Sequence, residues 1–363
     1  MRSRTEYDSL RGAQRLDNRL RAVVDIPSAM DGFTRKSFTT SRSLTYTYFD
    51  SGAAASTSND KPALLLLHGF PDGAKLWFKV IPHLLPLGRR IIAPDLLGYG
   101  GSSNPTDAAL FNSKAMTADV AELLAAEHVE RAVVIGHDWG SVLATRMWMW
   151  QPQLVAGVAM LNVHYIPPGP FDLAALNELF ESATGLPRYA YWDFFANQED
   201  AAGIIEKNLE TFWTVLHGEK DHLMGEHWCK HGAMRSFVEA DECLPLREYA
   251  RAETDGRLKE EWFAFVQERG IASSLCWYKA LAHGHHWNVE KELPSERLPI
   301  KVPSFFLGCT GDDVCLPALI EQNKEAGLVP DLTVQVVDSA HWSPYEKPAE
   351  IGKGLSEWIL AKC

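Results

Sequence analysis

The residues of this chain best suited to chemistry lie in Gly136-His137-Asp138-Trp139-Gly140, where an acid stands between small residues. The apolar run 132–135 before it predicts a buried strand, and 141–150 after it predicts a helix. A sharp turn between strand and helix, flanked by glycines, projects one strained side chain above a sheet. Serine is usual at that position, whereas a carboxylate is ionised at neutral pH and needs no base. Asp138 therefore suits attack on an alkyl carbon, which yields an ester.

Two further candidates follow predicted strands later in the chain. Asp312 follows the strand expected at 302–308, and His341 follows the strand expected at 332–337. Because the carboxyl ends of parallel strands meet at one edge of a sheet, we expect both to lie beside Asp138. His341 would activate water as a base, and Asp312 would fix its tautomer and stabilise the imidazolium. A lone acid or histidine after a strand is more often structural, but three in this order predict a catalytic triad of the α/β-hydrolase type.

The loop His68-Gly69-Phe70-Pro71 follows the strand expected at 63–67. We expect the backbone amides of Phe70 and Trp139 to form an oxyanion hole for a tetrahedral intermediate. The same loop could be only a tight turn with a cis peptide before Pro71, and the two interpretations are compatible. Two other acids near this edge are interpreted as a loop-fixing residue, Asp95, and a turn residue, Asp313.

A sheet with helices on both faces is needed to bring these residues together. Strands are expected at 63–67, 90–94, 132–135, 158–163, 302–308 and 332–337, and helices at 77–85, 116–128, 141–150, 317–326 and 349–361. This alternation predicts an α/β fold with a mostly parallel, doubly wound sheet, and 38–49 predicts antiparallel edge strands. From 164 to 299 the pattern is helical and aromatic, with helices expected at 173–182, 200–216, 258–268 and 273–282. The predicted organisation is an extension at 1–34, a core at 35–163 and 300–363, and an inserted helical cap at 164–299.

Composition excludes several classes of partner. A net charge of −12 over 363 residues disfavours nucleic acid and anionic membrane surfaces. No apolar run approaches the roughly 18 residues that span a bilayer, and the first residues do not resemble a signal peptide. Six scattered cysteines predict reduced thiols in a cytoplasmic protein. The metal-ligand residue types at 227–231 and 283–286 lack a partner cluster and are interpreted as cap surface, so we expect neither a metal nor a cofactor.

These motifs resemble those of the soluble type of epoxide hydrolase with the α/β-hydrolase fold. The resemblance covers residues 35–363 and includes the loops at 68–71 and 95–102, the turn at 136–140, Ala340-His341-Trp342 and Lys347-Pro348. Within the cap, Tyr191-Trp192-Asp193-Phe194-Phe195 and Leu275-Cys276-Trp277-Tyr278-Lys279 resemble the family's two tyrosine motifs. The resemblance implies that Tyr191 and Tyr278 hold the epoxide oxygen. A phenol has a pKa near ~10 and can donate a hydrogen bond or proton to the alkoxide formed by ring opening.

Several alternatives remain open at this point. Tyr189 and, more weakly, Tyr165 compete with Tyr191 for its role, and either cap tyrosine could be core. A haloalkane dehalogenase would share the triad but needs two halide donors, of which the sequence offers Trp139. An epoxide-opening cyclase would use the same residues, and a non-catalytic ligand-binding protein would tolerate their loss. Aromatic residues of the cap favour a small lipophilic epoxide as substrate. The residues expected to contact it are Phe70, Trp139, Trp192 and Trp277; the oligomeric state stays open.

Overall fold

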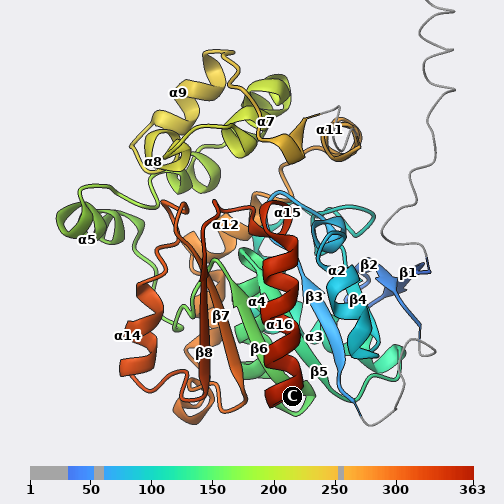
Figure 1. The fold of residues 1–363 in the computed structure, drawn as a ribbon. Coiled ribbons are helices and arrows are strands. Elements are labelled where there is room, and N and C mark those ends of the chain that lie inside the picture. The colour runs from blue at the N-terminus through green and yellow to red at the C-terminus, as the bar shows by residue number, and fades with distance from the viewer. Residues whose placement is uncertain (1–31, 53–60, 252–256) are drawn as a thin grey trace, which may run out of the picture. The chain divides into compact units, whose positions relative to one another are not determined.

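An eight-stranded sheet runs through the part of the chain that the structure, a computed structural model, describes, namely residues 32–52, 61–251 and 257–363 (Figure 1). Residues 1–31 of the predicted extension lie outside this part. The strands are β1 (Thr34–Thr39), β2 (Thr45–Asp50), β3 (Ala63–Leu67), β4 (Ile91–Pro94), β5 (Ala132–His137), β6 (Val155–Leu161), β7 (Ser304–Cys309) and β8 (Leu332–Val337). Their order is β1-β2-β4-β3-β5-β6-β7-β8. The pairs β1–β2 and β2–β4 are antiparallel and the remaining pairs are parallel, which confirms the predicted sheet.

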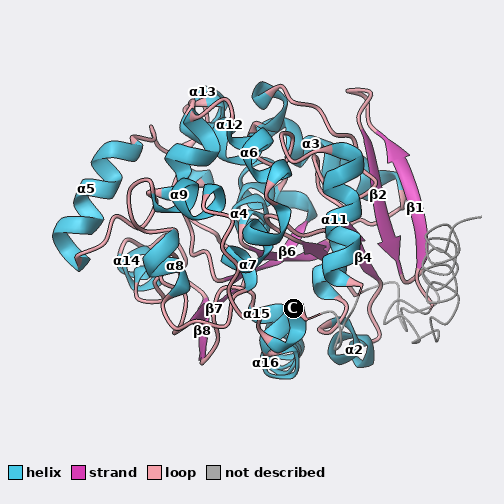
Figure 2. Ribbon diagram, turned by 90° about the horizontal axis from the view of Figure 1, so that it is seen from above, coloured by secondary structure: helices cyan, strands magenta, loops and turns pink. Residues whose placement is uncertain are grey.

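Helices cover both faces of the sheet. On one face α3 (Ser113–Ala126) packs against α4 (Trp139–Trp150), and on the other α2 (Ile81–Leu84) packs against α16 (Pro348–Lys362) (Figure 2). Two shorter helices, α14 (Leu319–Glu325) and α15 (Ser343–Glu346), flank β8 in the sequence. Every residue of β3, β4, β5 and β6 is buried, as expected for strands covered on both faces.

Between β6 and β7 the described chain forms helices and one isolated β-bridge, Gly218 to Leu246. We call residues 164–299 the helical insertion. It lies over the upper end of the sheet in Figure 1, where the parallel strands end. A π-helical turn, Asp193–Asn197, lies between its first two α-helices. Its helices are α5 (Leu173–Thr184), α6 (Ala201–Lys207), α7 (Leu209–His217), α8 (Leu223–His227), α9 (Ala233–Glu239), α11 (Leu258–Arg269), α12 (Cys276–Ala282) and α13 (His285–Glu290).

Proline and asparagine account for the helices that differ from expectation. The continuous helix predicted at 77–85 is wrong, because a 3-10 turn at Ala74–Trp77, α2 and another 3-10 turn at Leu85–Leu87 replace it. Pro82 and Pro86 each lack the N–H that a longer helix would use. The single helix predicted at 200–216 is also wrong, since Asn208 leaves the helical conformation between α6 and α7.

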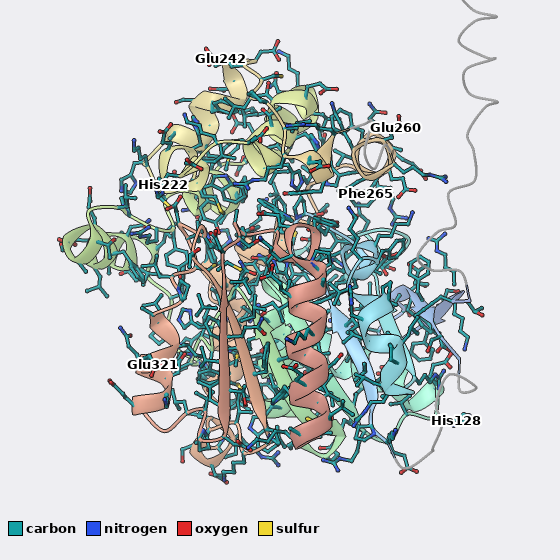
Figure 3. The ribbon with its side chains drawn as sticks, in the orientation of Figure 1. His128, His222, Glu242, Glu260, Phe265 and Glu321 are labelled. Carbon is teal, nitrogen blue, oxygen red and sulfur yellow. The ribbon has the colours of Figure 1, made fainter. Side chains whose placement is uncertain are left out.

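Charged and polar side chains occupy outer parts of the insertion, although Leu179 on α5 is also exposed. His222, Glu242 and Glu260 are exposed and lie on its outer parts (Figure 3). Its buried side chains, in contrast, are largely aromatic or aliphatic. Within the described residues, none of the helices combines the length and the apolar composition that a membrane crossing requires.

Candidate active site

Asp138 occupies a sharp turn between β5 and α4. Its backbone φ is +54°, in the left-handed region that non-glycine residues rarely adopt. A Cβ at Gly136 would overlap the carbonyl group of Gly140, and a Cβ at Gly140 would overlap the end of β3. Only glycine at these two positions therefore lets β5, α4 and the end of β3 approach one another this closely. Asp138 stands at the apex of the turn. Its strained backbone conformation persists only because the surrounding structure fixes it.

His341 lies between two carboxylates at the upper edge of the sheet. Its Nδ1 atom is 2.7 Å from Asp312 Oδ2, and its Nε2 atom is 3.6 Å from Asp138 Oδ2. The three residues follow three different strands, β5, β7 and β8. The structure therefore brings together the three residues that the sequence singled out after strand ends.

Asp312 is held by more groups than the sequence indicated. It accepts hydrogen bonds from Asn162 Nδ2 at 2.9 Å and from the amides of Val314 and Cys315 at 3.0 and 2.9 Å. Asn162 has φ +66° and accepts a hydrogen bond from Ser343 Oγ at 2.9 Å. We did not predict Asn162, although it directly follows β6 at the same edge of the sheet, which is the position that identified the other three residues.

Neighbouring charges decide the protonation of the His341–Asp312 pair. Burial alone would lower the pKa of His341, but the charge of Asp312, the nearby carboxylate of Asp138 and the hydrogen bond to Asp312 hold it well above the ordinary value. Burial would raise the pKa of Asp312, but the charge and hydrogen bond of His341, helped by the amide of Cys315, keep it below the ordinary value. An ion pair between imidazolium and carboxylate is thus favoured in the free protein.

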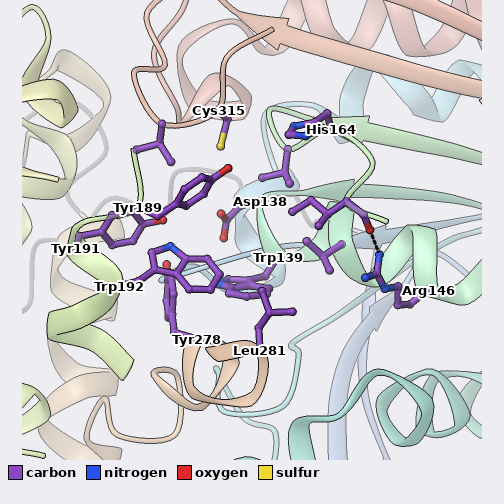
Figure 4. A pocket seen from close by; sticks show the side chains of 14 residues that line it. Asp138, Trp139, Arg146, His164, Tyr189, Tyr191, Trp192, Tyr278, Leu281 and Cys315 are labelled. Carbon is purple, nitrogen blue, oxygen red and sulfur yellow. Dashed lines mark hydrogen bonds between the residues drawn. The ribbon is translucent and has the colours of Figure 1, made fainter. Parts of the chain in front are cut away.

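Tyr191 and Tyr278 lie beside the Asp138 carboxylate. Their rings pack edge to face, with ring centroids 5.9 Å apart. Their hydroxyl groups converge beside Asp138, whereas that of Tyr189 points toward Cys315 (Figure 4). Burial and the charge of Asp138 raise the pKa of Tyr191, and burial, Tyr191 and Asp138 raise that of Tyr278. Both phenols therefore stay protonated and can donate. Tyr165, the weaker competitor, instead donates its hydroxyl to the carbonyl of Leu298 at 2.7 Å.

Asp138 and the three tyrosines 189, 191 and 278 line one pocket (Figure 4). Much of the remaining wall is apolar and is supplied by Val142, Val163, Ile166 and Leu281. Trp192 also lines the pocket, and its indole N–H is buried without a hydrogen-bond partner. The sequence did not identify two polar lining residues, Cys315 and His164.

The three other residues expected around the substrate lie in different places. The amide of Phe70 donates to Asp138 Oδ1 at 2.8 Å, while its ring packs on Tyr278. The peptide that follows, Phe70–Pro71, is cis. The Trp139 side chain lines the pocket. Trp277 does not, since its indole packs behind Trp139 and donates to the Leu97 carbonyl at 2.9 Å.

A buried ion pair joins the core to the insertion beside this pocket. Arg146 on α4 donates through Nε to Glu290 Oε1 on α13 at 2.8 Å, and both side chains are 1% exposed. Its Nη1 donates to the carbonyl of Ile166 at 2.5 Å. His286 lies 3.4 Å from Glu290 and is also buried. Placing 283–286 on the cap surface was therefore wrong for His286, because it pairs with a buried acid.

Three acids near the site have structural partners. Asp95 accepts hydrogen bonds from Ala74 N and Thr47 Oγ1 at 2.9 and 2.8 Å, which confirms its loop-fixing role. Asp313 accepts the Gly225 amide at 3.0 Å and so contacts α8 of the insertion. Buried Asp72 accepts hydrogen bonds from Trp342 and Tyr345, but burial raises its pKa to about 7.

Metal-ligand residue types occur in two places. Ligand atoms of Asp312, Cys315 and His341 lie within 4.8 Å of one another, although Asp312 and His341 already bond to each other. In the 227–231 segment, Trp228 and Cys229 are buried. The assignment of this segment to the surface was wrong for these two residues, because Trp228 packs on Tyr191.

Comparison with known proteins agrees with this geometry. Residues 62–348 match the family described as alpha/beta hydrolase fold. The chain is 33% identical over 331 residues to epoxide hydrolase B of Mycobacterium tuberculosis, covering 82% of this chain and 91% of that protein. It is 27% identical over 305 residues to bifunctional epoxide hydrolase 2 of Sus scrofa and spans about half (51%) of its length, with 82% of this chain covered. The crystal structure of epoxide hydrolase A from Mycobacterium thermoresistibile has the same fold, with a TM-score of 0.73, 23% identity and coverage of 91% and 99%.

Proposed function

Because this chain belongs to the α/β-hydrolase-fold family of epoxide hydrolases, we propose that it opens a lipophilic epoxide to a vicinal diol through an ester on Asp138. One observation carries the proposal. The Asp138 carboxylate lines one pocket with two protonated phenols, and Nε2 of His341, which is paired with Asp312, lies 3.6 Å from it. These groups are the nucleophile, proton donors and base that the two steps of such a reaction require.

In the first step Asp138 attacks a carbon of the epoxide. The carbon–oxygen bond of the ring breaks, and its electron pair goes to the oxygen. Tyr191 and Tyr278 donate hydrogen bonds to this oxygen, and one of them supplies a proton. Their raised pKa values, caused by burial and by Asp138, favour phenols that hold their protons until an alkoxide forms. The product of this step is a hydroxyalkyl ester of Asp138.

In the second step water hydrolyses the ester. His341 takes a proton from water, and the resulting hydroxide attacks the carbonyl carbon of the ester. The Phe70 amide, which donates to Asp138 Oδ1 in the free protein, stabilises the oxyanion, and we assign the Trp139 amide the same role. Collapse of this intermediate releases the diol and restores the Asp138 carboxylate. Asp312 stabilises the imidazolium throughout this step.

Ester formation would itself prepare His341 to act as a base. In the free protein the carboxylate of Asp138, 3.6 Å from His341 Nε2, is one of the causes that raise the pKa of His341. Once Asp138 is esterified it carries no charge, and this contribution disappears. The pKa of His341 then falls, so that the imidazolium gives its proton, through solvent, to the phenolate that the first step left on Tyr191 or Tyr278. The neutral imidazole can then accept a proton from water. The charge of Asp138 thus keeps His341 protonated until the ester has formed, so that ester formation precedes ester hydrolysis.

The helical insertion would act as a cap over the site. It supplies both phenols and part of the apolar wall of the pocket, including Leu281. A pocket of this kind favours lipophilic substrates and excludes bulk water from the alkoxide.

One observation supports a second candidate function, the displacement of halide from a haloalkane by Asp138. The unpartnered indole N–H of Trp192 lies beside Trp139, with ring centroids 5.3 Å apart. Two indole donors could hold a departing halide ion. The two phenols support the epoxide instead, because they can also return a proton to the leaving oxygen.

Trapping the ester tests both functions. The variant His341→Gln is offered styrene oxide, longer 1,2-epoxyalkanes and 1-chloroalkanes, and the intact protein is weighed. A gain equal to the whole epoxide, mapped to Asp138 and lost when both tyrosines become Phe, is the expected result. A gain equal to a haloalkane without its hydrogen halide would support the second candidate. No adduct from any compound, with no turnover by the unmodified protein, would refute the proposal. His231→Gln, which changes an exposed histidine, is the matched control and should not accumulate an adduct.

A further inference from the structure

His164 places a polar ring in an apolar stretch of the pocket wall. It lies three residues after the end of β6 and lines the same pocket as Asp138. Close to it in the sequence, Val163 and Ile166 also line the pocket. In Figure 4, His164 and the tyrosines 189 and 191 lie on opposite sides of Asp138. The pocket thus has a second polar position, away from the phenols.

His164 is half-buried, and one nitrogen of its ring is buried with its hydrogen-bonding capacity unused. Its Nδ1 atom has no hydrogen-bond partner. Burial lowers its pKa to about 4, so the imidazole is neutral at pH 7. A neutral imidazole offers one donor and one acceptor nitrogen. An unpaired polar group in such surroundings costs free energy, which a ligand that pairs with it recovers.

Among the described residues that line the pocket, none is a free cation that could receive an anionic group beside His164. Arg146 lines the same pocket, but its guanidinium bonds to Glu290 and to the Ile166 carbonyl. Glu290 balances its charge, and the carboxylate of Asp138 faces the same space. A carboxylate brought here would lose its hydration without gaining a counter-ion. A neutral oxygen substituent carries no such penalty.

We propose that His164 determines specificity by binding a neutral hydrogen-bonding oxygen, a hydroxyl or carbonyl group, on the part of the epoxide substrate remote from the phenols. This inference rests on the proposed function. It narrows the substrate class to lipophilic epoxides with one such oxygen outside the ring and disfavours the corresponding free acids.

The test compares matched substrates. They are 1,2-epoxyalkanes of one length that carry a methylene, hydroxyl, ketone or carboxylate group at successive positions. When the oxygen lies where His164 can reach it, we expect kcat/KM of the wild-type protein to be about tenfold higher for the hydroxyl or ketone substrate than for the methylene substrate, which is the effect of one neutral hydrogen bond. The carboxylate substrate should have the lowest kcat/KM. In His164→Leu the preference should fall to about one, and in His164→Asn it should partly return. The matched control Leu281→Val alters the wall without changing its polarity, so it should change all rates while keeping the ratio.

Binding separates this inference from the proposed function. Analogues in which a methylene replaces the epoxide oxygen cannot be opened, but their dissociation constants can be measured by calorimetry. If epoxides turn over but neither rates nor binding depend on His164, the inference is overturned and the proposed function stands. If no epoxide turns over but the hydroxyl analogue binds about tenfold more tightly than the methylene analogue only when His164 is present, the function fails and the inference about the site stands. Equal binding by wild type and His164→Leu, without turnover, overturns both.

Discussion

Replacing Asp312 by Asn should separate the two halves of the proposed reaction. Asp312 contacts His341 but not Asp138, so ester formation should continue while ester hydrolysis slows. The amide can still accept a hydrogen bond, but it carries no charge to stabilise the imidazolium. The protein should therefore accumulate as the ester under turnover conditions.

The size of the effect follows from one distance. Unit charges 2.7 Å apart, the separation of His341 Nδ1 and Asp312 Oδ2, interact with about 6 kcal/mol at an effective dielectric constant of ~20. Losing most of this stabilisation slows hydrolysis by about 10⁴-fold, the effect expected when the acid of such a triad is neutralised. The single oxygen of the replaced side chain could still accept from the amides of Val314 and Cys315, which would keep its position, whereas its NH2 group could no longer accept from Asn162.

The assay is single-turnover quench flow with intact-mass detection of the ester and of the free protein. The control is Asp338→Asn, which neutralises an exposed acid three residues before His341 that accepts a hydrogen bond from the Thr310 hydroxyl at 3.1 Å. This control should hydrolyse the ester at the wild-type rate. The reasoning would be refuted if Asp312→Asn slowed ester formation as much as hydrolysis, or if the control reproduced its effect.

Three further predictions concern the remaining groups. Tyr191→Phe and Tyr278→Phe should each slow ester formation by about 10²-fold, since each removes one donor to the oxygen; an unchanged rate in quench flow would contradict this. In Asp138→Asn the pKa of His341 should fall, because the interaction with a carboxylate that raises this pKa is lost; NMR titration of the ring nitrogens measures it. The stability that the raised pKa of His341 supplies is complete below ~6.5 and is lost as the pH rises through the raised value, so Asp138→Asn should lower Tm more at pH 6 than at high pH. Glu290→Gln should lower the unfolding free energy by about 3 to 5 kcal/mol in denaturant melts, because it leaves a buried arginine unpaired; a loss below about 1 kcal/mol would contradict the argument.

The sheet was the most predictable part of the fold. The strands predicted at 63–67 and 332–337 coincide with β3 and β8 residue for residue. A short apolar run between turn residues leaves little freedom in where a strand begins or ends. The bounds of the helices were less predictable, because they depend on local interruptions that the pattern of apolar residues does not reveal. Prolines divide the region of α2, and α8, α9 and α13 are too short to show a clear period.

The site was predictable where residues follow strands and less so elsewhere. Asp138, Asp312 and His341 could be placed together because parallel strands end at one edge. Which side of a short helix faces a pocket cannot be read from its sequence. Trp277, adjacent to Tyr278 on α12, was expected to contact substrate, yet its indole binds the Leu97 carbonyl. His164 follows a strand too, but no pattern distinguishes a histidine that faces a pocket from one that faces solvent.

Two adjacent residues of the loop after β7 contact different parts of the protein, the catalytic histidine and the helical insertion. Asp312 holds the imidazole ring, and the next residue, Asp313, holds α8 through the Gly225 amide and the insertion through Arg188, which donates to its carbonyl at 2.6 Å. A displacement of this part of the insertion would pull on the same short loop that orients His341. The orientation of His341 and the position of α8 are therefore linked through two neighbouring residues of one loop. A substitution in α8 that moved Gly225 would be transmitted to the imidazole of His341, although it lies outside the pocket.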